Sequence, residues 1–473
     1  MTRIADSGSA VRASFQQVTD AFLQTPGLPF AELLSADEIA QVFAKHDGLF
    51  GQDDVYSTDR VLWAFLGQVL RDGKEAACQS AVAGIATYQQ QTGGLVPTAD
   101  TGDYCRARKK LAVAALQELA VKTATRVQEN APEAWKWKGR DAKLVDGFTA
   151  TLQDTEANQA ADPQPRTQKP GRGFPIIRAC VVLSLASACA LQLAYGPYSG
   201  KETGETALLR ELLDTFSKGD VLVADRFYCS FFLIGLLLNR KVDVCARMHA
   251  RRHVDFRRGQ RLGKYDHLIT WTRPARPAWM SEEQYATIPE KLELREIRFN
   301  LVIPGRRTQA LTIATTLTDA EKYTKEDIAE LYGFRWNAEL DLRSIKQGLG
   351  MDHLRCKSPA MVRRELWTAM LAYNLIRTTA AAAAVLHHKQ PRQLSFTSTC
   401  QYVLASWMLL SAGAVPAAQV LDHARTLLWR IAQCEVANRP GRVEPRVLKR
   451  RRHRYPLMRR PRAELRTELL QCT

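Results

Sequence analysis

The spacing of apolar residues changes near Ala142, and this change limits the folds open to the chain. Residues up to about Lys138 carry apolar side chains at helical spacing. From Ala142 the apolar runs are short, as in β-strands, and a helix-like segment at 206–216 lies among them. Strands mixed with helices indicate an α/β domain. The strand-like runs cover residues 143–145, 176–185, 190–195 and 221–224.

A second strand-rich segment interrupts this α/β region. It is rich in basic and turn-forming residues and contains strand-like runs at 294–303 and 308–316. We therefore predict a β-rich insertion within an α/β core. The predicted divisions are an N-terminal helical domain at 1–138, core segments at 139–240 and 318–390, the insertion at 241–317, a C-terminal helical region at 391–438 and a basic tail at 439–473.

The charge balance indicates a polyanionic partner. The chain has 66 Lys and Arg against 49 Asp and Glu, a formal net charge of +17 at pH 7. Nucleic acid is the first candidate, although an anionic membrane surface attracts the same charge. Between Arg439 and Arg462 eleven basic residues accompany one acidic residue. For this tail we favour DNA clamping over RNA binding or a solvated extension.

Basic residues also gather between Arg106 and Lys110, near the end of the N-terminal helical region. DNA contact and a solvated linker explain this cluster equally well. DNA contact would make residues 1–138 a DNA-binding domain.

Neither the N-terminus nor the long apolar stretches predict a membrane protein. The first ten residues lack the apolar region of a signal peptide. Polar residues interrupt the stretch at 179–194, and Pro416 breaks the one at 402–418. We expect a cytoplasmic protein without a membrane partner, associated with the nucleoid if it binds DNA.

The cysteines do not form a recognisable framework. Ten cysteines are scattered without a CxxC pair, so reduced thiols are expected. Cys245, His249 and His253 stand at four-residue steps and could share a helix face as metal ligands. No fourth ligand is evident, which disfavours a metal site there.

One charged helix face stands out beyond Thr324. Thr324 and Asp327 have the spacing of a capping box, and a helix from there can reach Gly348 or Gly350. At helical periodicity four polar side chains fall within an arc of about 60° beside the apolar stripe. An alternative is an exposed ion-pair ladder formed by Arg335, Glu339 and Arg343. The four residues are Tyr332, Arg335, Glu339 and Lys346.

Two aspartates weaken that alternative. Asp225 ends the apolar run at 221–224, and Asp146 follows Val145 at another strand position. Strand ends in α/β sheets present side chains to a crevice, although Asp also occurs there as a turn former. Three carboxylates under a basic surface suit phosphodiester chemistry with two Mg²⁺ ions, because hard cations need oxygen ligands.

These segments together resemble bacterial insertion-sequence transposases of the DDE type. The resemblance is to the subgroup whose signature is Tyr, two residues, Arg, three residues, Glu, six residues, Lys, and every interval from Tyr332 to Lys346 matches. It extends over about residues 56–462. Further matching blocks are LVDGFTATLQDTEAN around Asp146, VLVADRFYCS around Asp225, and AYNLIR at 372–377.

The resemblance implies a ribonuclease-H-like core, divided by a β-strand insertion between the second Asp and the Glu. It implies that Asp146, Asp225 and Glu339 hold two ions of Mg²⁺ or Mn²⁺. It further implies that Tyr332, Arg335 and Lys346 contact phosphates near the cleaved end of double-stranded DNA.

The implied reaction is cleavage of one strand at each terminal inverted repeat, followed by attack of the 3′-hydroxyl on target DNA. A homodimer in a synaptic complex is expected by analogy. Related enzymes often form a hairpin and stack a flipped base on an aromatic of the insertion, for which Trp271 and Trp279 are candidates. The alternatives are an inactive or domesticated transposase that regulates by binding DNA, and a metal-dependent nuclease without strand transfer.

Overall fold

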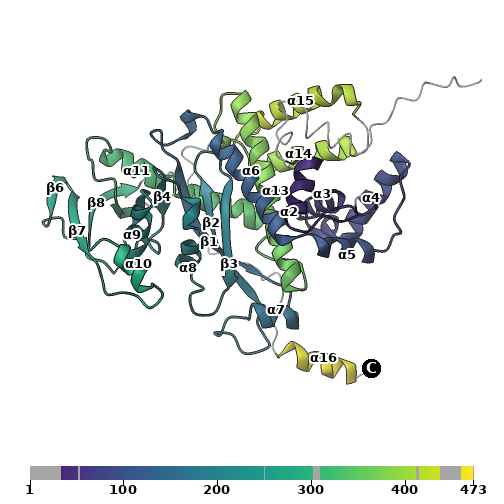
Figure 1. Cartoon of the computed structure of the whole chain (residues 1–473), viewed down its shortest axis with the longest axis horizontal. Coiled ribbons are helices and arrows are strands. Elements are labelled where there is room, and N and C mark those ends of the chain that lie inside the picture. The colour runs from purple at the N-terminus through teal and green to yellow at the C-terminus, as the bar shows by residue number, and fades with distance from the viewer. Residues whose placement is uncertain are drawn as a thin grey trace, which may run out of the picture. The chain divides into compact units, whose positions relative to one another are not determined.

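A computed structural model describes residues 34–51, 54–249, 251–301, 309–411, 415–436 and 460–471 (Figure 1). Most of the predicted basic tail therefore lies outside the described residues. The chain forms two compact units. The helical unit comprises Met1–Asn130, Ser344–Met351 and Arg363–Val436, and the sheet unit comprises Ala131–Arg343, Asp352–Val362 and Ala437–Thr473.

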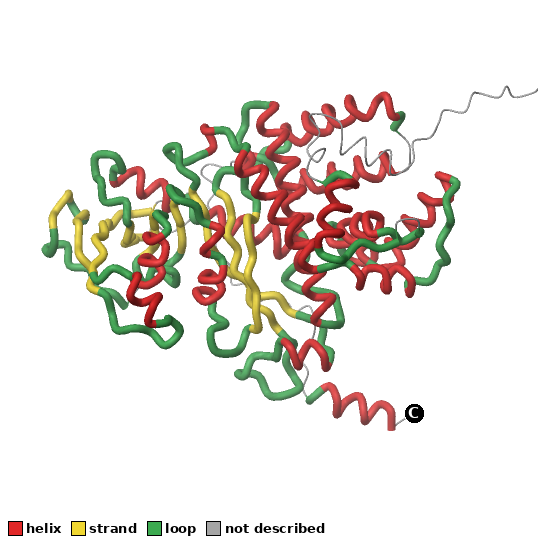
Figure 2. Tube along the Cα trace, viewed as in Figure 1, coloured by secondary structure: helices red, strands yellow, loops and turns green. Residues whose placement is uncertain are grey.

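The sheet unit is built on a single mixed sheet, shown in yellow in Figure 2. Its strand order among the described residues is β3-β2-β1-β4-β5-β9-β8-β7-β6. Each strand-like run predicted from the sequence overlaps one of its strands, although residues 302, 303 and 308 of these runs lie outside the described residues, so the α/β class is confirmed. The strands are β1 (Ala142–Thr151), β2 (Ile176–Ser184), β3 (Ala190–Pro197), β4 (Val221–Ala224), β5 (Asp243–Arg247), β6 (Gln260–Gly263), β7 (Asp266–Thr272), β8 (Lys291–Leu301) and β9 (Gln309–Thr315).

Strand β1 runs parallel to β4 and antiparallel to β2, and β4 runs parallel to β5. All four residues of β4 are buried. A continuous apolar strand of this kind is typical of a parallel strand covered on both faces. The segment predicted as an insertion does not form a separate body, because β9 pairs with β5 and extends the same sheet.

Short helices pack against this sheet. Helix α8 contacts β2 and β3, α9 contacts β5, and α12 contacts β1. The helical segments of the sheet unit are η2 (Glu133–Trp135), α7 (Glu156–Ala161), α8 (Glu205–Glu211), η3 (Leu213–Thr215), α9 (Phe231–Asn239), α10 (Glu282–Thr287), α11 (Lys325–Gly333), α12 (Trp336–Arg343) and α16 (Arg462–Gln471).

The prediction of one continuous helix beyond Thr324 was wrong. Its capping box at Thr324 and Asp327 is present, but α11 ends at Gly333 and α12 begins at Trp336. Tight i→i+3 bonds, such as Arg335 N–H to Tyr332 C=O at 3.1 Å, replace helical ones at the junction. After Arg343 the backbone widens into a π-helical turn, η4 (Ser344–Gly348). Regular periodicity therefore does not hold from Tyr332 to Lys346.

The helical unit brings together segments that the predicted boundaries had separated. Trp63 of α3 packs edge-on against Trp407 of α14 at 5.2 Å between ring centroids. The Asn374 side chain of α13 donates to the Ala120 carbonyl of α6 at 2.9 Å. The helices are α2 (Ala36–Lys45), α3 (Thr58–Val69), η1 (Gly73–Ala76), α4 (Cys78–Thr92), α5 (Gly102–Lys110), α6 (Val113–Glu129), α13 (Pro359–Leu386), η5 (Pro391–Gln393), α14 (Phe396–Ser411), η6 (Ala417–Gln419) and α15 (Val420–Gln433).

Helix α13 alone, among the described helices, is long and apolar enough to cross a membrane. Inside the fold 83% of its most apolar window is buried, as in the core helix of a soluble protein. The nine described cysteines are all free thiols, as the sequence predicted.

Glu118 of α6 links two helices of the helical unit through its carboxylate. Hydrogen bonds from Lys45 and His46, each at 2.8 Å, lower the pKa of Glu118 to about 2. A lowered pKa in the folded state stabilises the fold above the ordinary pKa of 4.5, and this contribution is lost as pH falls toward 2.

We expect Glu118→Gln to lower the free energy of unfolding by about 1 kcal/mol at pH 7, because an ionised hydrogen-bonded pair is lost. Urea unfolding at pH 7 and pH 3 measures this, and the difference between variant and wild type should shrink at pH 3. Glu129→Gln, at the exposed end of the same helix, is the control. An equal loss at both pH values would contradict the assignment.

Candidate active site

Asp146 and Asp225 lie on neighbouring strands of the sheet. Val145 of β1 is paired with Ala224 of β4 in a parallel register, so each aspartate is the next residue along its own strand. Strand β4 ends there, whereas β1 continues to Thr151 beside β2. The end of β4 opens the edge at which both carboxylates emerge.

The Asp146 carboxyl is held in a largely desolvated position. Burial raises its pKa to about 6, while the hydrogen bond from the Gly147 N–H at 2.8 Å and the positive charge of Arg335 oppose the rise. The charges of Asp225 and Glu205 add to it. This group is therefore surrounded by like charge that one arginine only partly offsets.

Asp225 also shapes the turn that follows β4. Its Oδ1 accepts a hydrogen bond from the Phe227 N–H at 2.7 Å, and its carbonyl accepts one from the Tyr228 N–H at 3.3 Å. The turn-forming role considered from the sequence is real. It does not exclude a chemical role, because the same turn fixes the carboxyl beside Asp146.

Glu339 reaches this region through α12, which packs on β1. Its Oε1 accepts a hydrogen bond from Arg335 at 2.7 Å, so the first rung of the predicted ion-pair ladder is present. Arg335 also lies close enough to Asp146 for each to influence the pKa of the other. The guanidinium thus links the carboxyl on α12 to the one on β1.

The remaining two signature residues differ in position. Tyr332 is 4% exposed, and its burial raises the pKa of its hydroxyl against the opposing charges of Arg335 and Arg247. A buried ring does not offer its surface to DNA in this conformation. Lys346 is half-exposed in the π-helical turn η4, which belongs to the helical unit.

Glu205 was missed by the sequence reasoning. It is the first residue of α8, and its carboxyl occupies the space that a side chain on Gly147 would need. Burial raises the pKa of Glu205, Arg178 opposes this, and Asp225 reinforces it. The only sequence signal was a glutamate at a helix start, which is common at surfaces.

The Cys245, His249 and His253 cluster does not form the predicted helix face. Cys245 is buried in strand β5, and His253 is exposed in the following turn. An extended chain rises about 3.3 Å per residue, so a four-residue step that begins in β5 separates the side chains, whereas a helix would stack them on one face.

The two candidate stacking tryptophans are both engaged. Trp271 is 4% exposed, its indole N–H donates to Glu296 at 2.8 Å, and the Arg252 guanidinium lies 3.5 Å from its ring centroid. Trp279 packs edge-on against Phe232 and lies 3.9 Å below the Arg210 guanidinium. Trp271 is thus a core residue, and its ring face is already covered.

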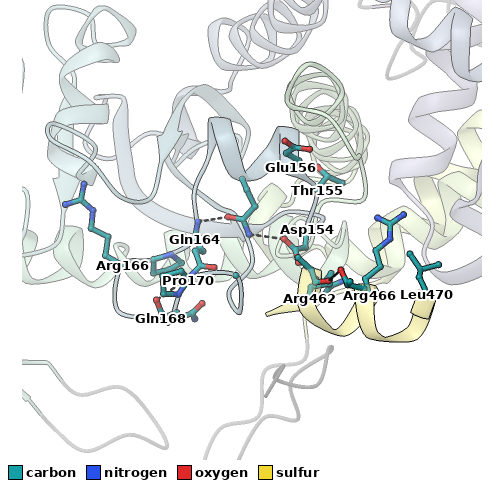
Figure 3. Close-up of a pocket in the computed structure, with 15 residues that line it drawn as sticks. Asp154, Thr155, Glu156, Gln164, Arg166, Gln168, Pro170, Arg462, Arg466 and Leu470 are labelled. Carbon is teal, nitrogen blue, oxygen red and sulfur yellow. Dashed lines mark hydrogen bonds and ion pairs between the residues drawn. The ribbon is translucent and has the colours of Figure 1, made fainter. Parts of the chain in front are cut away.

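A groove of about 890 Å³ lies elsewhere in the sheet unit, between α16 and the segment after β1 (Figure 3). Arg462 closes one side of it through an ion pair with Asp154 at 2.8 Å. The Arg462 N–H also donates to the Gly171 carbonyl at 3.3 Å. None of the six predicted site residues lines this groove, so its size does not mark the candidate site.

Comparison with known proteins decides the family. The family described as the transposase DDE domain matches residues 137–375, which is half of the chain and includes β1, β4 and α12. The chain belongs to the DDE transposase family. It is 29% identical to the transposase InsG for insertion sequence element IS4 of Escherichia coli (strain K12) over 362 residues, which are 74% of this chain and 77% of that relative.

A solved structure, the piggyBac transposase synaptic complex with hairpin DNA, aligns over 88% of this chain and 85% of that chain. Its TM-score is 0.42 and its sequence identity 9%. The assignment of the chain to the DDE transposase family rests on the sequence comparisons.

Members of this family generally use divalent cations, and the donor chemistry here fits them. Asp146 and Asp225 lie side by side on the neighbouring strands β1 and β4, and their like charges favour a cation. Within the described residues, however, no three Asp, Glu, His or Cys side chains are close enough to hold an ion. The Glu339 carboxylate is paired with Arg335 instead. Glu339 must therefore leave Arg335 before it can bind a cation together with Asp146 and Asp225.

The burial of Asp146, with the neighbouring carboxylates, predicts a pH dependence of the stability of the metal-free protein. Because its pKa is raised in the folded state, the protonated group adds stability below the ordinary value of 3.8, and this is lost as pH rises through about 6. We expect Asp146→Asn to increase the free energy of unfolding at pH 8 by ~2 kcal/mol, and by less at pH 4.5.

Urea unfolding in the presence of a chelator measures this effect. Asp214→Asn, whose carboxyl is 94% exposed, is the control and should leave the pH profile unchanged. If Asp146→Asn and wild type show parallel pH profiles, Asp146 is not in a crowded anionic centre.

Proposed function

We propose that this transposase cuts and rejoins DNA by a cut-and-paste route with Asp146, Asp225 and Glu339 as its catalytic carboxylates. The observation that carries the proposal is the adjacent emergence of Asp146 and Asp225 from parallel strands, with Arg335 linking Asp146 to Glu339. A mixed core of β1 to β5, with the first strand central, supports a ribonuclease-H-like catalytic domain.

Two Mg²⁺ or Mn²⁺ ions held by these carboxylates would activate the attacking oxygen and stabilise the leaving one. The chain's own residues orient these carboxylates and bind the phosphate. Asp225 is oriented by its turn, and the Gly147 N–H fixes one oxygen of Asp146. Release of Glu339 from Arg335 would free a planar guanidinium for a phosphate of the substrate.

The proposed substrate is double-stranded DNA, first at the terminal inverted repeats and then at the target. Lys346 is proposed as a second phosphate contact, because its ammonium is half-exposed in η4. Tyr332 is proposed to support Arg335 from the core in the DNA-free protein and to contact a phosphate when DNA binds. We further propose a homodimer in the synaptic complex and residues 1–138 as a DNA-binding domain.

The proposal predicts that Asp225→Ala lowers strand cleavage by about 1000-fold, the scale expected when an electrostatic stabiliser of the reaction is removed. The assay offers purified protein a duplex carrying the element's own end, with Mg²⁺, and follows both cleaved strands and joined 3′-hydroxyl products. Asp214→Ala, which removes an exposed carboxyl, is the control.

The products of this assay separate the competing functions. Joined products from wild type exclude a nuclease without strand transfer. DNA binding without cleavage by wild type would favour an inactive or domesticated regulator. Equal cleavage by wild type and Asp225→Ala would reject the assigned carboxylates.

The basic tail is proposed to clamp DNA without sequence preference. Replacing Lys449, Arg450, Arg451 and Arg452 by Gln removes four charges. We expect the slope of log affinity against log salt to fall in magnitude by up to about 3.6, because fewer counterions are released. Fluorescence anisotropy across a salt series measures the slope, and an unchanged slope would show that these side chains do not contact phosphates.

A further inference from the structure

Glu205 lies beside the proposed catalytic carboxylates without being part of the family signature. Its helix, α8, begins after strand β3 and packs on β2 and β3. A Cβ built on Gly147, the residue next to Asp146, would lie 2.3 Å from the Glu205 carboxyl carbon. The carboxyl therefore fills a space that exists only because position 147 has no side chain.

One other side chain helps to hold Glu205 in this place. The Tyr228 hydroxyl, on a fully buried ring, lies 3.4 Å from Glu205 Oε2. Tyr228 belongs to the turn that Asp225 organises, so the carboxyl is tied to the second catalytic strand as well as to the first. Arg178 of β2 is a neighbouring cation, and its Nη1 donates to the Thr203 carbonyl at 3.0 Å.

An anion in this position has an electrostatic cost in the metal-free protein. Its neighbours include the carboxylates of Asp225 and Asp146, and the guanidinium that compensates it is that of Arg178. A glutamate that served only to cap or solvate α8 would gain nothing from pointing at Asp146. A divalent cation at the same edge would turn this repulsion into attraction.

We propose that Glu205 supplies a fourth negative charge to the cation-binding centre and increases its affinity for divalent metal. This inference rests on the proposed function, since it assumes that Asp146 and Asp225 bind the metal. Glu205 acts through the field and the position of its carboxyl, held by Gly147 and Tyr228, and not through contact with DNA.

The first test is a calorimetric titration of the full-length, metal-free protein with Mn²⁺ alone. Glu205→Gln keeps the size of the side chain and a hydrogen-bond acceptor for Tyr228. We expect its Mn²⁺ affinity to fall by about tenfold or more, the scale for residues that support metal ligands. Glu211→Gln, at the exposed end of the same helix, should leave the affinity unchanged.

Thermal unfolding gives a readout that a merely structural role would not produce. Without metal, Glu205→Gln should be as stable as wild type or more stable, because one repelling charge is gone. With saturating Mn²⁺ it should gain less in melting temperature than wild type. A glutamine variant that is destabilised equally with and without Mn²⁺ would overturn the proposal.

Gly147→Ala tests the position of the Glu205 carboxyl by changing the residue that leaves room for it. The added methyl group displaces the Glu205 carboxyl, so it should weaken Mn²⁺ binding in wild type. In the Glu205→Gln background the same change should have a much smaller effect, since interacting positions are not additive. Independent effects of the two changes would contradict the proposal.

Asp225→Ala distinguishes failure of this inference from failure of the proposed function. If Asp225→Ala abolishes Mn²⁺ binding while Glu205→Gln leaves it unchanged, only the role of Glu205 is rejected. If neither change affects Mn²⁺ binding, the metal-binding role of the aspartates is rejected as well.

Discussion

The parallel pairing of β1 with β4 is the contact on which the proposed catalytic centre depends. It brings Asp146, within β1, beside Asp225, at the end of β4, although the two residues are 79 positions apart in the sequence. The apolar side chains of β4, buried on both faces, fix the register of that pairing. Any shift of one residue would turn one aspartate toward the opposite face of the sheet.

Negative charge is concentrated around this strand pairing, and the neighbouring residues partly compensate it. Burial and the neighbouring carboxylates raise the pKa of Asp146, while Arg335 opposes them. Arg335 is itself shared with Glu339. In the metal-free protein this arginine takes part of the compensating role that a cation would have. Metal binding and phosphate binding are therefore coupled in the proposed mechanism, because both draw on the same guanidinium.

The backbone from Tyr332 to Lys346 is irregular at two points, the tight junction at Phe334–Arg335 and the π-helical turn at Ser344–Gly348. A regular helix would keep the four signature residues on one face. The two irregularities instead orient Tyr332, Glu339 and Lys346 independently of one another. Departures of this kind are frequent at functional sites. Here they place Glu339 over β1 in the sheet unit and assign Lys346 to the helical unit.

The sequence by itself determined six of the nine described strands, the helical character of the chain before Ala142 and beyond Thr324, the capping box and the family, because these depend on local spacing and on a signature with fixed intervals. It also supplied the six residues proposed for the site. Only the tertiary structure decided that the N-terminal helices and residues 391–433 belong to one unit, since amphipathic faces do not specify their partners. Likewise, only the tertiary structure showed that Glu205 lies beside the proposed site. Its side chain is surrounded by Gly147, Tyr228 and Asp146, and no periodic pattern in the sequence distinguishes it.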